Sequence, residues 1–174
     1  MRARSIALAI AVMALVLVPA SASSAASQGN TVCTWGGTHT APTGSITFAP
    51  GYTNTPSPTP ISFTATGPLG GGCTGKLTFT GVIDPGGTCV ANAPFHVTKA
   101  TGLPPVKTAE GGPGVAGSGP VLIYDAEGTV VGSEQAQFLT AAATDPNDPG
   151  YTACNTPQGL THANWSDTIE IFAH

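Results

Sequence analysis

The chain has 174 residues, of which only 8% are charged, with five basic and nine acidic side chains. Two of the basic residues lie at the extreme N-terminus, so residues 27–174 keep three lysines against nine acids, a formal net charge of −6. Three scattered lysines exclude nucleic-acid binding and attraction to an anionic membrane surface, since both need clustered Lys and Arg. A length near 150 residues suits one domain with a single core.

Residues 1–26 have the layout of a secretory signal peptide. A short basic region precedes the apolar run Ile6–Val18, whose 13 residues are fewer than the roughly 20 that cross a bilayer. Pro19 ends the run, and cleavage fits equally well after Ala22, Ala25 or Ala26. We therefore expect a secreted protein, not inserted in a membrane after processing, with residues 27–174 as one β domain. The alternative is an uncleaved N-terminal anchor.

Apolar and polar residues then alternate with period two in several segments, which is typical of half-buried strands. In chain order these segments are 45–48, 61–66, 76–81, 95–97, 121–125, 128–132 and 167–173. Segments rich in Gly, Pro and Asp separate them and predict turns. Residues 133–143 favour a further strand over a helix capped by Ser133. The pattern predicts an all-β fold, either an antiparallel β-sandwich or a small β-barrel.

The four cysteines predict two structural disulfides. They lie 40, 16 and 65 residues apart, without the close pairs of a zinc site or the C-x-x-C of a redox site. A strand over residues 74–83 is about 33 Å long, so Cys73 and Cys89 lie at opposite ends of a hairpin. A disulfide needs Cα atoms within about 7 Å. We expect Cys89 to begin the return strand of this hairpin, so a Cys73–Cys89 bond is disfavoured. Of the two remaining pairings, Cys33–Cys73 with Cys89–Cys154 is preferred over Cys33–Cys89 with Cys73–Cys154, because it ties the N-terminal strand and the late loop to the central hairpin.

Four aromatic residues next to turn residues form a candidate binding surface: Trp35, Tyr52, Tyr151 and Trp165. Exposed aromatic rings on loops stack on sugars or on partner proteins. The competing interpretation, which we favour for both tryptophans, is that they pack over the ends of the sandwich or against the disulfides. On a strand, Trp35 would share the face of Cys33, two residues earlier.

Candidate catalytic groups are few, and we expect no cofactor or metal. The histidines, His39, His96, His162 and His174, are isolated in sequence. An acid from a separate strand, Asp84 or Asp125, could pair with His96 as in a small hydrolase. The turn at residues 145–150 lacks the ligand spacing of an EF-hand loop. Ser118 lacks the G-x-S-x-G context of a nucleophile elbow.

Three long segments resemble small secreted proteins of actinobacteria: CTWGGTHTAPTGSITFAPG, CTGKLTFTGVIDPGGTC and LIYDAEGTVVGSEQAQ. The resemblance covers most of residues 27–174. It implies export and a composition rich in Ala, Gly, Thr and Pro, but no assigned activity or site residue.

Three functions are compatible with these features. The first is a non-enzymatic exported module that binds an extracellular protein, a glycan or the cell envelope, and it calls for exposed aromatic pairs. The second is a small secreted hydrolase built on a histidine and an acid that meet in a cleft. The third is a β-barrel that carries a small apolar ligand, and it calls for an interior cavity.

Overall fold

The computed structural model describes residues 29–115, 121–139 and 149–173. The predicted signal peptide with its cleavage sites, Ser118, the turn residues 145–148 and His174 lie outside the described residues.

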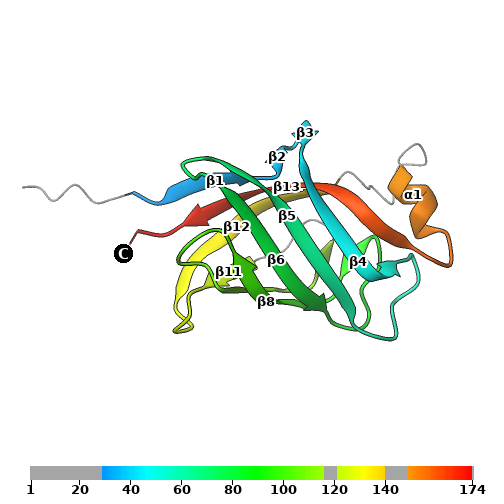
Figure 1. Ribbon diagram of the computed structural model, residues 1–174. Helices are drawn as coiled ribbons and strands as arrows, with labels where there is room; N and C mark the ends of the chain where they lie inside the picture. Colours follow the sequence, from blue (N-terminus) through cyan, green and yellow to red (C-terminus); the bar gives the residue numbers. More distant parts are fainter. Residues whose placement is uncertain (1–28, 116–120, 140–148, 174) are drawn as a thin grey trace, which may run out of the picture.

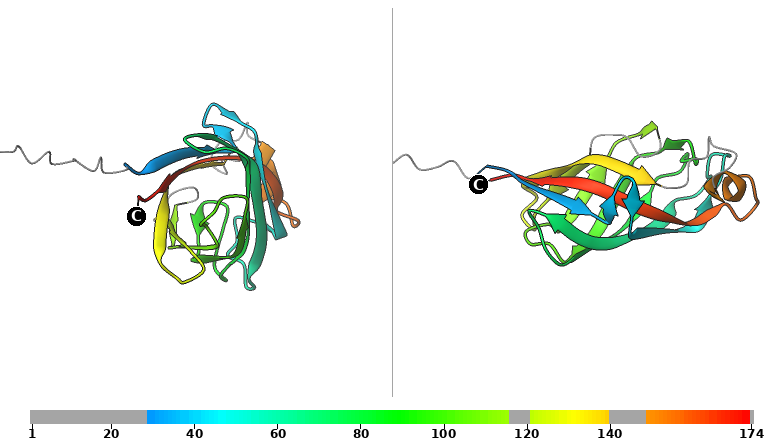
Figure 2. Two further views of the ribbon diagram at one scale, coloured as in Figure 1. Left: turned by 60° about the vertical axis from the view of Figure 1, so that its left-hand side comes forward. Right: turned by 90° about the horizontal axis from the view of Figure 1, so that it is seen from above.

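The domain is a closed antiparallel β-barrel, which decides between the two predicted architectures (Figures 1 and 2). Each barrel strand pairs with the next one in chain order, and the last strand, β13, pairs with the first, β4, to close the ring. The eight barrel strands are β4 (Gly44–Tyr52), β5 (Ile61–Gly71), β6 (Lys76–Ile83), β8 (Phe95–Thr101), β9 (Thr108–Gly111), β11 (Val121–Tyr124), β12 (Val130–Leu139) and β13 (Leu160–Ile171).

A further strand, β1 (Thr31–Trp35), continues the line of β4 between the same two neighbours, β5 and β13. The chain leaves this line after Trp35, forms the small hairpin of β2 (Gly37–Thr38) and β3 (Ala41–Pro42), and returns at Gly44. Strand β13 is long enough to pair with β4 over its first half and with β1 over its second. The two segments together therefore fill one position in the barrel wall.

Glycines allow the chain to leave the barrel wall after Trp35 and to return at Gly44, because the backbones of β1, β4 and β13 approach closely there. A Cβ atom on Gly44 would lie 2.7 Å from the carbonyl oxygen of Trp165 and 2.9 Å from the Cα of Gly36. Gly36 itself has a φ of +74°, a region that residues with a side chain rarely adopt. Its amide donates to the carbonyl of Pro68 on β5 at 2.8 Å, which fixes the chain where it turns away from the wall.

The barrel interior is the hydrophobic core. The alternating apolar residues predicted from the sequence point inward and are buried, as Ile46 with Phe48 on β4 and Phe63 with Ala65 on β5 show. Their polar neighbours, Thr47 and Ser62 among them, are exposed on the outer face. Strands in which apolar residues alternate with threonine thus form a closed wall around an apolar interior. Closure leaves no sheet edge unpaired.

Both predicted disulfides are present, with the predicted pairing. Cys33–Cys73 joins β1 to the β5–β6 connection with Cα atoms 5.2 Å apart, and Cys89–Cys154 spans 6.2 Å between Cα atoms. Two structural disulfides are typical of proteins in an oxidising compartment. Cys89 does not start the return strand as expected, since β8 begins only at Phe95.

The connection between β6 and β8 covers one end of the barrel, which we call the capped end. It includes the short strand β7 (Ala91–Asn92), which pairs with β10 (Gly114–Val115). The amide of Cys89 donates to the carbonyl of Thr53 at 2.9 Å, and the amide of Asn54 donates to the carbonyl of Cys154 at 3.1 Å. Cys154 ends the six-residue helix α1 (Pro149–Cys154), so the disulfide and these bonds hold three connections together.

Residues 133–139 extend β12, in agreement with the predicted strand. The sequence patterns did not indicate β9 or the first half of β13, where polar residues interrupt the alternation. Within the described ranges, no helix is both long and apolar enough to cross a membrane.

Candidate functional site

A cavity lies inside the barrel and reaches toward the capped end. Its volume is about 60 Å³, measured as the space open to the centres of water molecules, and it is not fully sealed from solvent. A single water needs roughly 10–15 Å³ on this measure, so the cavity holds more than one water or one small organic group. Its lining consists of Trp35, Ile46, Phe48, Tyr52, Phe63, Ala65, Phe79, Ile83, Thr88, Cys89, Asn92, Phe95, Glu134, Leu160 and Trp165.

Aromatic rings from both ends of the sequence dominate this lining and contact one another. The indole of Trp35 lies 5.2 Å from that of Trp165 in an edge-on arrangement and 4.8 Å from the ring of Phe79, between ring centroids. Phe48 and Tyr52 form a second pair at 4.9 Å. Phe63 and Phe95 form a third, T-shaped pair at 5.8 Å. Such contacts hold the rings in defined orientations, so the cavity wall is ordered.

Two polar atoms in this wall have no hydrogen-bond partner among the described residues: the hydroxyl of Tyr52 and the indole Nε1–H of Trp165. Both side chains are 4% exposed. The indole of Trp35 offers a comparison, because its Nε1–H donates to the carbonyl of Leu77 at 3.1 Å. Burial also raises the pKa of the Tyr52 phenol well above its ordinary value, so the hydroxyl remains protonated at neutral pH and available as a donor.

One acidic residue, Glu134 on β12, also lines the cavity and is 9% exposed. It is the one charged residue in the lining, and it makes interactions of its own within the protein. All three lysines of the domain (Lys76, Lys99 and Lys107) are exposed on the outside. The cavity therefore offers no basic group to an anion.

Three of the four residues of the predicted aromatic binding surface are not exposed. Both tryptophans are buried, as we favoured, but they line the cavity inside the barrel. Trp35, Tyr52 and Trp165 are almost completely buried. Their rings lie on β1, β4 and β13 and form part of the cavity lining. The side chain of Tyr151 lies outside the described part of the structure.

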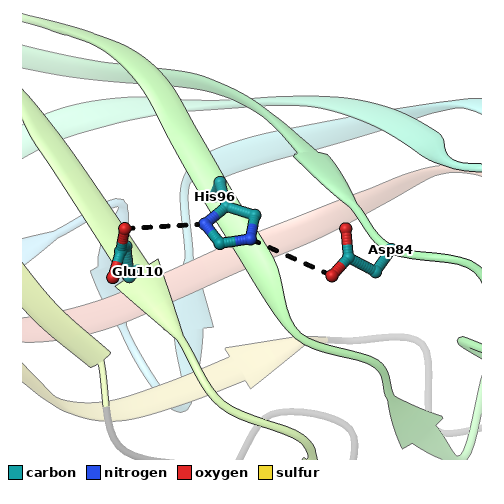
Figure 3. Close-up of polar contacts among 3 residues, drawn as sticks. All are labelled: Asp84, His96 and Glu110. Carbon is teal, nitrogen blue, oxygen red and sulfur yellow. Dashed lines mark ion pairs between the residues drawn. The ribbon is translucent and has the colours of Figure 1, made fainter.

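The predicted pairing of His96 with an acid is present on the outer face of the barrel (Figure 3). His96 Nε2 lies 3.9 Å from Asp84 Oδ2, and His96 Nδ1 lies 3.7 Å from Glu110 Oε1. The three side chains are 46–61% exposed and are absent from the cavity lining. A catalytic pair needs a cleft that positions a substrate, and these residues lie on an open sheet surface.

Asp125, the other acid considered as a partner for His96, has a structural role. Its Oδ1 atom accepts hydrogen bonds from the backbone amides of Glu127 at 3.0 Å and Thr129 at 2.8 Å. It therefore stabilises the turn between β11 and β12. In the described ranges, no cluster of three or more His, Cys, Asp or Glu side chains is arranged to hold a metal ion.

Several lining residues were not recognised as site residues from the sequence. Phe48, Phe63 and Phe79 were assigned only to the buried face of strands, and Glu134 was not singled out. The available signal was a single acid within a strand of mixed polar and apolar residues, VVGSEQAQFL. That signal becomes readable only when the register of β12 is known.

Comparison of the chain with protein-family models, with curated proteins and with solved structures finds no match.

Proposed function

We propose that this protein is an exported β-barrel that binds a small, largely apolar molecule in its interior cavity. The observation that carries the proposal is the partly open cavity with seven aromatic residues in its lining, two of which present unpaired polar atoms. Ligand sites are typically concave and apolar, with a small number of polar groups that fix the orientation of the ligand. The lining has this composition.

Packing energetics support a functional reason for the cavity. Protein interiors are as dense as organic crystals, and empty space inside them lowers stability. A buried donor without a partner costs about 1–3 kcal/mol more. A ligand that fills the space and accepts these hydrogen bonds would recover both contributions.

The size of the cavity limits the ligand. A cavity of about 150 Å³ lined by aliphatic and aromatic residues binds benzene, and the volume here is about 60 Å³. A molecule with a single ring is therefore larger than the cavity. It can bind if part of it extends out of the open side of the cavity, or if the ring of a lining residue moves. Phe95 is suited to such a shift, because it lines the cavity and is only partly buried.

The test uses toluene with the purified processed protein. Both tryptophans of the chain line the cavity, so intrinsic fluorescence reports directly on its contents. We expect a saturable fluorescence change and a rise in the melting temperature. At ten times the dissociation constant the stabilisation is about 1.4 kcal/mol, or roughly 3–6 °C for a domain of this size.

Two variants of β5 provide the control. Ala65→Leu adds three carbon atoms at a lining position that is 1% exposed, and it should abolish the response to toluene. Thr64→Leu makes a similar change at the adjacent, outward residue and should leave the response intact. Ala65→Val serves if the larger side chain disturbs folding. The proposal fails if wild type shows no saturable response, or if both β5 variants respond as wild type does.

A further inference from the structure

The chemical class of the ligand follows from the polar atoms in the cavity wall, given that the cavity binds a ligand as proposed above. We propose that the ligand is an uncharged aromatic molecule carrying an acceptor oxygen, such as a carbonyl, which receives a hydrogen bond from Trp165 Nε1–H or the Tyr52 hydroxyl. Hydrocarbons are therefore poorer ligands than aromatic ketones of the same shape.

The geometry around Trp165 requires an acceptor. An indole nitrogen donates one hydrogen bond and accepts none, and this one has no partner among the described residues although its side chain is 4% exposed. The neighbouring Cδ1 atom lies 3.0 Å from the position that a Cβ on Gly44 would occupy. One edge of the indole is thus packed against the β4 backbone, and because Trp165 also lines the cavity, an acceptor held in the cavity is the partner that we infer for this donor.

The hydroxyl of Tyr52 is the second donor, and it lies at the capped end. It would be 2.9 Å from a Cβ atom on Gly87, and Gly87 is followed by the lining residues Thr88 and Cys89. Tyr52 is opposite Leu160 in the β4–β13 register. Leu160 precedes Trp165 by five residues, so the backbones that carry the two donors are separated by about 16 Å. The donors therefore serve two different regions of the cavity, joined by apolar wall.

The charge of the ligand follows from the rest of the lining. No lysine or arginine is among the lining residues and Glu134 is the one charged member, so an anionic ligand would be buried without a counter-ion, which is costly. Glu134 and the aromatic faces would tolerate a cation. A cation, however, has no acceptor for the two donors. The Tyr52 hydroxyl can donate or accept, but the Trp165 indole can only donate, so a neutral molecule with an acceptor oxygen fits both groups.

The experiment compares acetophenone with ethylbenzene, which has the same carbon skeleton and lacks the carbonyl oxygen. Calorimetric titration should show wild type binding acetophenone about tenfold more tightly than ethylbenzene, the value of one well-formed hydrogen bond to a neutral group. Whichever of Tyr52→Phe and Trp165→Phe removes the donor that the carbonyl uses should lower this ratio at least threefold, and the other substitution should have a smaller effect. In the double variant ethylbenzene should become the better ligand, because the carbonyl then loses its hydration without replacement.

The ratio of the two affinities separates hydrogen bonding from shape, since any change in the size of the cavity affects both molecules. The proposal on ligand class is overturned if wild type binds ethylbenzene as tightly as acetophenone, or if phenyltrimethylammonium binds more tightly than acetophenone. Binding of neither neutral molecule would instead contradict the proposed function itself. Val32→Ala, at an exposed position on β1, is the matched control and should leave the ratio unchanged.

Discussion

The Cys89–Cys154 disulfide should make a large contribution to the stability of the barrel, and its removal provides a quantitative test of the capped end. The two cysteines are 65 residues apart in sequence. For a loop of this length, the chain-entropy relation gives a stabilisation of about 4 kcal/mol at 25 °C. Alanine is the preferred replacement for both cysteines, because the sites are buried and a serine hydroxyl would be left without a partner.

The expected result of Cys89→Ala/Cys154→Ala is a lower midpoint in guanidinium denaturation followed by circular dichroism. With a denaturant slope of roughly 4 kcal/mol/M for a domain of this size, the midpoint should fall by about 1 M. The matched control is Cys33→Ala/Cys73→Ala, whose separation is 40 residues. Loop length alone makes the two contributions differ by only about 0.4 kcal/mol.

A fall of less than about 0.3 M for the Cys89/Cys154 variant would refute the reasoning. It would mean that the hydrogen bonds of Cys89 with Thr53 and of Asn54 with Cys154 hold the capped end together without the covalent link. A fall much larger than in the control would show that the disulfide also stabilises the native packing of the cavity wall, to which Cys89 belongs.

Three further predictions concern single residues. Gly44→Ala should lower the free energy of unfolding, measured by urea denaturation, by about 1–3 kcal/mol, because the added methyl group meets backbone atoms on both sides. Gly29→Ala is the control and should be neutral, since its methyl group would meet nothing within 4 Å. Equal effects of the two substitutions would contradict the close approach of the backbones at Gly44. Burial raises the pKa of Tyr52, so the unfolded state loses the phenolic proton at a lower pH than the native state. The free energy of unfolding should therefore decline above pH 10, by up to about 1.4 kcal/mol per pH unit. Tyr52→Phe should remove this part of the decline, and an unchanged alkaline profile in this variant would contradict the prediction. His96→Ala should change stability by less than about 0.5 kcal/mol, since its contacts with Asp84 and Glu110 are exposed, and a loss above 1 kcal/mol would show a structural role.

Local sequence patterns were sufficient for the fold class and for the inward face of several strands. Phe48, Phe63 and Phe79 were placed on buried faces because alternation is a local property of a strand. The length of one hairpin, which is also local, excluded a Cys73–Cys89 bond; the choice between the two remaining pairings depended on how distant segments meet, and the preferred pairing is the one observed. Export of the protein and the function of its domain remain predictions, since the described residues do not include the N-terminal segment.

The site could not be predicted from the same patterns, because it depends on which strands meet across the barrel. Trp35 and Trp165 are 130 positions apart, and their contact exists only because β1 and β13 pair. Gly36 beside Trp35, and Asn164 and Ser166 beside Trp165, placed both residues near predicted turns. In the structure Gly36 and Gly44 let the backbones approach closely, so the tryptophans lie in a crowded part of the wall and not on an exposed loop.

The central position of β13 has a consequence for how the protein acquires its structure. This strand follows all the other described strands, yet it pairs with β1, β4 and β12, so the ring cannot close until residues 160–171 are available. Contacts between such distant segments form slowly, because the intervening chain must first be brought together. Loss of residues 160–171 would remove the pairings of β13 with β4 and β1 on one side and with β12 on the other. We expect the remaining strands to form an open sheet that associates with other chains through its free edges.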